Sequence, residues 1–214
     1  MFKVTTSEIR DLIIAFIFIS LSFSILYSGR NIAALQQIFP IVMIGLGLGF
    51  ILHELGHKFT SMHYGYWAEF KLWPAGLIFA LVSSFFGFVF AAPGAVYTYA
   101  GNYLDDKTNG VISLAGPVVN IVLALVFLFI AVAIYPSAFY DSTMQFIFIV
   151  CSLGFSTNSY LAVFNLSPVW NLDGSKVLRW NIGIWLITIA IAGIMTFMSM
   201  TVGVENIVRI LIGF

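Results

Sequence analysis

Charged side chains are absent from six long stretches of this sequence, and their absence constrains the fold more than any other feature. The stretches are 18 to 33 residues long and cover 12–29, 31–52, 72–104, 108–140, 142–172 and 180–204. A helix needs about 20 apolar residues to cross the hydrocarbon core of a bilayer, so each stretch is long enough to be tested as a span. With 61% hydrophobic and 8% charged residues, the chain cannot be a soluble globular enzyme or a disordered tail. We therefore predict a polytopic membrane protein.

The remaining composition narrows the class further. The net charge is zero and the sequence contains no basic patch, so nothing indicates binding to nucleic acid. Cys151 is the single cysteine, which rules out an internal disulfide and a disulfide-stabilised secreted scaffold. No linker or internal repeat divides the chain. We expect one membrane-embedded domain over residues 1–214, with its first apolar stretch retained as a span and not cleaved as a signal sequence.

The second apolar stretch leads directly into a motif with metal chemistry, His53-Glu54-Leu55-Gly56-His57. Residues four apart lie on one face of a helix, so His53 and His57 can bind the same metal ion. Glu54 lies beside that face, where its carboxylate can take a proton from a metal-bound water. With three histidines and four glutamates in the chain, chance gives this motif in roughly one sequence in a thousand. A metal site is therefore predicted here.

A zinc hydrolase needs a third protein ligand, and three ligands leave the fourth position open for water. His63 has the spacing of the H-E-x-x-H-x-x-G-x-x-H motif, but Thr60 replaces the glycine at which that chain turns. On a continued helix, His63 would lie about 240° around the axis from His57 and face away from the metal. Asp173 follows a long uncharged stretch broken by asparagines and a proline, and is either a ligand or a helix cap. We favour Asp173 as the ligand.

Three sequence blocks together resemble the site-2 protease family of intramembrane zinc metalloproteases. They are H-E-L-G-H at 53–57, A-G-P-V-V-N at 115–120, and F-N-L-S-P…N-L-D-G at 164–174. The third block is the most specific, and the resemblance covers a core of about residues 45–180. Trp170, with Val169 before it, departs from the family pattern, which affects the local geometry more than the identity of the ligands.

The resemblance implies an activity and a set of roles. The protein would cleave transmembrane segments of other proteins within the lipid bilayer, using one Zn²⁺ per chain. The metal ligands would be His53, His57 and Asp173. Glu54 would be the general base, and Asn165 a polar group near the scissile carbonyl. A transmembrane protein substrate and the bilayer are then the expected partners, and nucleic acid is not.

Two other functions compete with this one. A membrane zinc protease acting on soluble or prenylated chains would more often use a late glutamate or histidine as third ligand, but Glu205 lies at the far end of the last stretch. A non-proteolytic membrane protein with a structural zinc site would need no general base, yet Glu54 is intact. Asn120 is expected to form a hydrogen bond between helices and not to take part in catalysis.

The stretch 72–104 must differ from the others if His57 and Asp173 are to bind one metal. Three full crossings between these residues would place them on opposite sides of the membrane. Prolines and glycines interrupt 72–104, and its flanks, 69–73 and 95–99, have the composition of strands. We predict an all-α polytopic membrane protein with five to six transmembrane helices, a re-entrant element over 72–104, and a small β-element near the active site.

This topology also distributes the basic residues unevenly. If 72–104 does not cross, seven of the nine basic residues share one side of the membrane: Lys3, Arg10, Lys58, Lys71, Lys107, Lys176 and Arg179. Basic residues accumulate on the cytoplasmic side of membrane proteins. We therefore expect a multi-pass protein of the cell membrane with its N-terminus and its active site towards the cytoplasm.

Overall fold

The computed structural model describes residues 4–89, 93–101 and 104–213, and most of them are helical. The chain forms two compact units, Met1–Tyr103 and Leu104–Phe214, which are described separately below. In the described part of the chain, five helices are long and apolar enough to cross a membrane: Thr6–Tyr27, Ile32–His63, Asp106–Ile134, Ser142–Leu166 and Ile182–Thr201. The prediction of a polytopic, mainly helical membrane protein is confirmed.

The first unit begins with α1 (Thr6–Tyr27), whose N-cap Thr5 accepts a hydrogen bond from the Glu8 N–H. The second span consists of α2 (Ile32–Val42), a π-helical turn η1 (Met43–Gly47) and α3 (Leu48–His63). Single π turns inside helices are rare and often occur near functional sites. Here η1 directly precedes the helix that carries the His-Glu motif.

Close packing between α1 and the second span depends on Gly47. A Cβ atom at this position would lie 2.5 Å from the Phe16 ring and 2.7 Å from Ser20 Oγ, both on α1. Small residues allow membrane helices to approach in this way.

A two-stranded antiparallel sheet follows α3 in the chain. Strand β1 (Trp67–Leu72) pairs with β2 (Gly94–Tyr99), with Phe70 opposite Val96. The small β-element predicted from the flanks of the third stretch is therefore present, with each strand one residue longer than expected.

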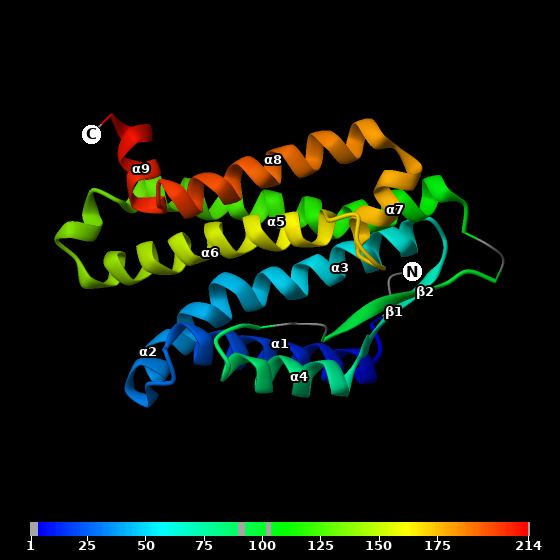
Figure 1. Ribbon diagram of the computed structural model, residues 1–214, viewed down its shortest axis with the longest axis horizontal. Coiled ribbons are helices and arrows are strands. Elements are labelled where there is room, and N and C mark those ends of the chain that lie inside the picture. Colours follow the sequence, from blue (N-terminus) through cyan, green and yellow to red (C-terminus); the bar gives the residue numbers. More distant parts are fainter. Residues whose placement is uncertain (1–3, 90–92, 102–103, 214) are drawn as a thin grey trace. The chain divides into compact units, whose positions relative to one another are not determined.

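Helix α4 (Pro74–Ser84) lies between the two strands and packs along α1 in Figure 1. Its 11 residues are too few to cross a bilayer. The segment between the two strands begins and ends at the same place, because the Trp73 N–H donates to the Pro93 carbonyl at 2.8 Å. The chain thus leaves and rejoins the sheet at one place, as expected of a re-entrant element.

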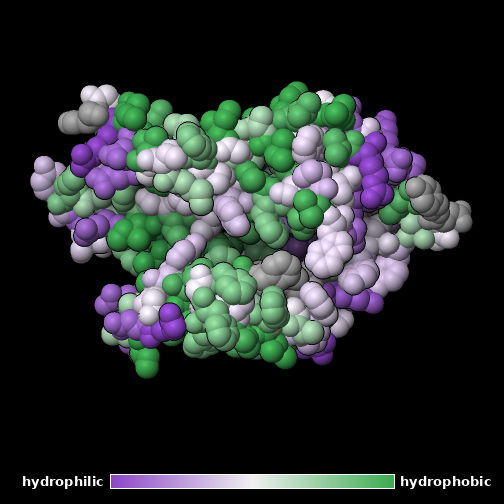
Figure 2. Space-filling model, in the orientation of Figure 1, coloured by the Kyte–Doolittle hydropathy of each residue, from purple (hydrophilic) through white to green (hydrophobic). Residues whose placement is uncertain are grey.

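The second unit contains α5 (Asp106–Ile134), the short 3₁₀ helix η2 (Ser137–Phe139), α6 (Ser142–Leu166), α7 (Asp173–Trp180), α8 (Ile182–Thr201) and α9 (Val204–Ile212). Helices α5, α6 and α8 run side by side, as Figure 1 shows, with fully buried alanines at their contacts. In Figure 2, hydrophobic residues cover the middle of these helices and hydrophilic residues gather towards their ends. This distribution suits helices surrounded by lipid.

A buried polar contact joins α5 to α6. The Asn120 Nδ2 donates to the Asn158 Oδ1 at 2.9 Å, and both side chains are fully buried. The expected interhelical hydrogen bond of Asn120 is confirmed. Bonds of this kind between membrane helices contribute about 0.6–2 kcal/mol.

Candidate metal centre

Helix α3 places the two histidines of the motif on one face. The Nε2 atoms of His53 and His57 lie 3.0 Å apart, and both side chains are buried. Two nitrogens bound to one tetrahedral zinc at 2.0–2.1 Å are about 3.3 Å apart. The histidine pair is therefore spaced to share a zinc ion without rearrangement of the helix.

Glu54 is oriented by the sheet. Its Oε2 accepts a hydrogen bond from the backbone N–H of Val96 on β2 at 3.2 Å. Two turns further along α3, the hydroxyls of Ser61 and Thr98 lie 2.7 Å apart, so β2 follows this face of the helix. The carboxylate is consequently held next to the histidine pair by a backbone N–H. No sequence motif predicts this donor.

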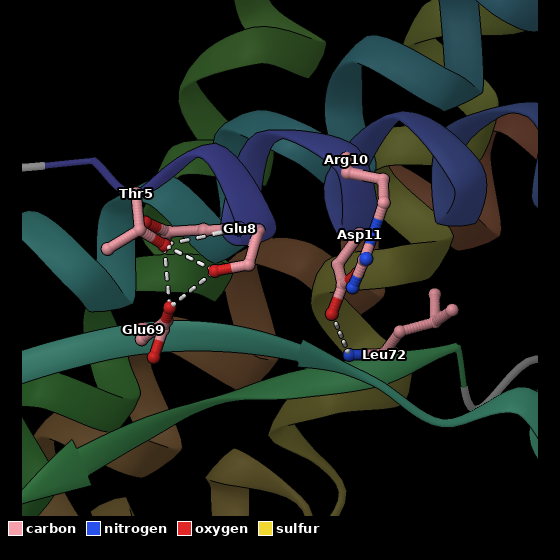
Figure 3. Close-up of polar contacts among 7 residues, drawn as sticks. Thr5, Glu8, Arg10, Asp11, Glu69 and Leu72 are labelled. Atoms are coloured by element: carbon pink, nitrogen blue, oxygen red, sulfur yellow. Dashed lines mark hydrogen bonds and ion pairs between the residues drawn. The ribbon is translucent and has the colours of Figure 1, made fainter.

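The outer edge of β1 is bonded to side chains of α1. On β1, the Phe70 N–H donates to the Glu8 Oε1 at 3.1 Å and the Leu72 N–H to the Asp11 Oδ2 at 3.4 Å. Figure 3 shows the bond from Leu72 to Asp11 and, nearer the start of α1, the bond from Thr5 to Glu69. Carboxylates of α1 therefore occupy the outer edge of β1.

The N–H groups of a strand alternate in direction, and this alternation shows which N–H groups of β2 point away from β1. Because residues 70 and 72 point away from β2, the N–H groups of their cross-strand partners 96 and 94 point away from β1. The bond from Val96 to Glu54 agrees with this direction. The outer edge of β2 thus runs along the carboxylate of Glu54.

Asp173 lies in the second unit, as the first residue of α7. Leu172 is the N-cap residue, so Asp173 does not act as the helix cap that we considered as its alternative role. Its side chain is 12% exposed, and its Oδ1 lies 3.8 Å from the Lys176 Nζ, one turn along the helix. A carboxylate in the first turn of a helix is favoured by the helix dipole.

Gly174 fixes the start of α7 against the end of α6. A Cβ atom on Gly174 would lie 1.8 Å from the carbonyl oxygen of Leu166. The same carbonyl accepts a hydrogen bond from the Trp185 Nε1 at 2.8 Å. The glycine of the L-D-G element is therefore required for close backbone packing, and it determines where its neighbour Asp173 lies within this unit.

The departure from the family pattern at Trp170 has a structural counterpart. Val169 to Leu172 form a turn closed by the Leu172 N–H donating to the Val169 carbonyl at 3.3 Å. Trp170, at the second position, has φ of 55°, which type II′ turns normally assign to glycine. Its side chain is 87% exposed, so packing does not compensate for the backbone strain.

Trp170→Gly is therefore expected to stabilise the protein by about 1 kcal/mol, because relief of the strain exceeds the entropy cost of glycine. The measurement is thermal unfolding in detergent. Trp170→Ala is the control, since it removes the same side chain but keeps the strain. Equal melting temperatures for the glycine and alanine variants would contradict this explanation.

Two further residues singled out in the sequence have clear positions. Helix α3 continues without a turn to His63, so His63 faces away from the His53–His57 side, as expected, and its ring packs against Tyr64. Asn165 lies near the end of α6 and is partly buried. Its Nδ2 donates to the Leu161 carbonyl at 2.9 Å.

Sequence reasoning missed two features of the site. The first is the N–H of Val96, which carries no signal in residue type. The second is a buried ion pair between Glu8 and Lys58. The sequence indicated only that Lys58 shares a helix face with Glu54, four residues earlier, and gave no signal that its partner would be Glu8.

Comparison with known proteins shows the family. A protein of Methanocaldococcus jannaschii named "Putative zinc metalloprotease MJ0611" is 39% identical over 199 residues, which are 92% of this chain and 97% of that protein. "Putative zinc metalloprotease YwhC" of Bacillus subtilis is 30% identical over 161 residues, 67% of this chain and 69% of that protein. No family model matches the chain, and no solved structure matches it.

The two relatives and the long apolar helices together define the class as a membrane metalloprotease. The chain belongs to the zinc metalloprotease family of these two relatives, and its cofactor is zinc.

Proposed function

We propose that this protein is an intramembrane zinc metalloprotease of the site-2 type, which hydrolyses peptide bonds within or near the transmembrane segments of membrane-anchored proteins. The observation that carries the proposal is the position of the motif. His53, Glu54 and His57 belong to an apolar span and are buried, while their helix lies beside the outer edge of β2. Ionisable residues in such a span are costly and mark functional sites.

The residues that would hold zinc are His53, His57 and Asp173. The two imidazoles already have a suitable spacing, and a carboxylate completes the donor set of many hydrolytic zinc sites. When bound, zinc would lower the pKa of a coordinated water towards about 7, and the metal would polarise the carbonyl under attack. We propose Asp173 as third ligand because it follows the L-D-G pattern and is not needed as a helix cap.

Glu54 would move the protons of the reaction. Its carboxylate takes a proton from the attacking water and delivers it to the nitrogen of the departing amine. The Val96 N–H keeps one carboxylate oxygen, Oε2, in a fixed direction. The other oxygen, Oε1, can then receive the proton without reorientation of the side chain.

The outer edge of β2 would hold the substrate in an extended form. A peptide bond within a helix is poorly exposed to attack, so the transmembrane helix of the substrate has to unwind locally. Addition of an extended peptide to a strand edge is a common mode of recognition. Two N–H groups of the β1 edge are taken by Glu8 and Asp11, so we propose that the peptide adds along the β2 edge, beside the bond from Val96 to Glu54.

Asn165 would assist at the scissile carbonyl. Its amide forms a bond to the Leu161 carbonyl, one turn back on the same helix. A substrate carbonyl can replace this acceptor, and the amide would then stabilise developing negative charge on the substrate oxygen.

The placement in the cell is part of the proposal. With α4 as a re-entrant helix and five spans, the N-terminus and the site lie on the side with the most basic residues. We propose that this side is the cytoplasmic face of the cell membrane. Water would reach the site from there.

Asp173→Ala tests the third ligand. Loss of a direct ligand is expected to weaken zinc binding by more than about 100-fold, the upper range for residues that only support a ligand. Zinc content of the purified protein after dialysis against a weak chelator measures this, with Asp141→Ala as control, an exposed helix-cap aspartate in the same unit. Full zinc content in Asp173→Ala would remove Asp173 from the ligand set.

A further inference from the structure

A buried ion pair outside the metal-binding motif ties the sheet to the catalytic helix. The Lys58 Nζ is paired with the Glu8 Oε2, and neither side chain is exposed to solvent. The Nζ also lies 5.6 Å from the centre of the Trp67 ring. Burial of two charges is costly unless each is paired and hydrogen-bonded, so the pair requires an explanation.

The contacts of Glu8 connect three elements of the first unit. Its Oε2 pairs with Lys58 on α3, and its Oε1 accepts the N–H of Phe70 on β1 at 3.1 Å. Its own N–H is held by Thr5 at the start of α1, whose hydroxyl also donates to Glu69 of β1, as Figure 3 shows. One carboxylate therefore sets the distance between α1, α3 and the sheet.

The chain of contacts returns to the motif. From Phe70 it passes across the sheet to the paired residue Val96, whose N–H donates to Glu54. Glu54 and Lys58 are four residues apart on α3 and so share one helix face. The sheet is thus attached to this face at Glu54 and at Lys58, one turn apart, and again at the Ser61–Thr98 hydroxyl contact one turn beyond Lys58. The attachment at Lys58 sets the position of the sheet from which the Val96 N–H reaches Glu54.

We propose that Lys58 and Glu8 are positioning residues for the general base, acting through β1 and β2 and not through the metal ligands. The proposal rests on the proposed role of Glu54. Without the pair, the sheet shifts on α3 and the bond from Val96 to Glu54 lengthens. The histidine pair is unaffected, because His53 and His57 belong to α3 itself.

The test uses the full-length, zinc-loaded protein with Lys58→Met, and Lys107→Met as a matched control at an exposed lysine. We expect Lys58→Met to keep its zinc and to lower kcat per zinc-bound chain by about 10- to 100-fold, the effect of a small misplacement of a catalytic group. KM should stay within about twofold, since the strand edge itself remains. The control should match the wild type.

A direct readout of the linkage is the amide signal of Val96 in protein labelled with ¹⁵N-valine, assigned with Val96→Ile. Lys58→Met and Glu54→Gln should both shift this signal, and Lys107→Met should not. The double variant Glu8→Gln/Lys58→Met should recover part of the kcat that Lys58→Met loses. Glutamine removes the Glu8 charge that Lys58→Met leaves unpaired, but it still accepts the Phe70 N–H.

Each outcome decides for or against the proposal. If Lys58→Met lowers only the melting temperature, with kcat per zinc-bound chain and the Val96 signal unchanged, the pair is structural and the proposal fails. Loss of zinc would also overturn it. If Lys58→Met does not fold, Glu8→Gln alone is judged by the same readouts. A wild type that cleaves no membrane peptide would refute the proposed function, while the Val96 signal would still test the positioning.

Discussion

Glu54→Gln is expected to stop peptide cleavage and to leave zinc bound. Glutamine has nearly the same shape and still accepts the Val96 N–H, so the sheet and the histidine pair stay in place. It cannot take a proton from water, and loss of a general base lowers kcat by about 10²–10⁴-fold. The measurement is cleavage of a single-span peptide in lipid vesicles, with zinc content determined on the same sample.

The histidines provide the comparison for this result. His57→Ala should lose both zinc and activity, because it removes one of the two nitrogens that lie 3.0 Å apart. If Glu54→Gln retained most of the wild-type rate, the base would have to be another group. If it lost its zinc, the carboxylate would have a role in metal binding.

Gly174→Ala is expected to be among the most damaging single-methyl changes in the second unit. The new Cβ would lie 1.8 Å from the oxygen and 2.2 Å from the carbonyl carbon of Leu166, both backbone atoms that cannot rotate away. Helix α7 would have to separate from the end of α6, and Asp173 would move with it. Overpacking of this kind costs about 3 kcal/mol or more. Thermal unfolding and zinc content should both fall.

Gly193→Ala is the matched control for this variant. Gly193 lies within α8, and a Cβ atom there would meet no other atom within 4 Å. Alanine in a helix is more favourable than glycine by about 0.5–1 kcal/mol, so this variant should be as stable as the wild type or slightly more stable. Equal effects of the two substitutions would show that the backbone contact at Gly174 is not what limits stability.

The elements of the fold were largely predictable because they depend on hydrophobicity and on the positions of prolines and glycines. Charge-free stretches predicted the spans, and the prolines and glycines within 72–104 predicted that this stretch forms no full span and is flanked by strands. The π turn at Met43–Gly47 was not predictable, since its residues suit an α-helix equally well. Gly47, its last residue, approaches α1 closely, which is a tertiary contact.

The same division holds for the site. The spacing of the histidines was enough to predict that His53 and His57 share one helix face and that His63 faces away from it. The bond from Val96 to Glu54 comes from the backbone, which is chemically alike at every position, so no pattern could identify it. The partner of Lys58 is 50 residues earlier in the chain, and only the packing of α1 on β1 brings Glu8 to it.

The most direct test of the central claim is the location of the cut. The zinc-loaded protein would be reconstituted with a single-span substrate in vesicles, and mass spectrometry would identify the cleaved bond. We predict one or a few cuts within or next to the apolar segment, present with the wild type and absent with Glu54→Gln. Cuts confined to the water-exposed tails, or the same products from both proteins, would contradict an intramembrane protease that uses Glu54 as its base.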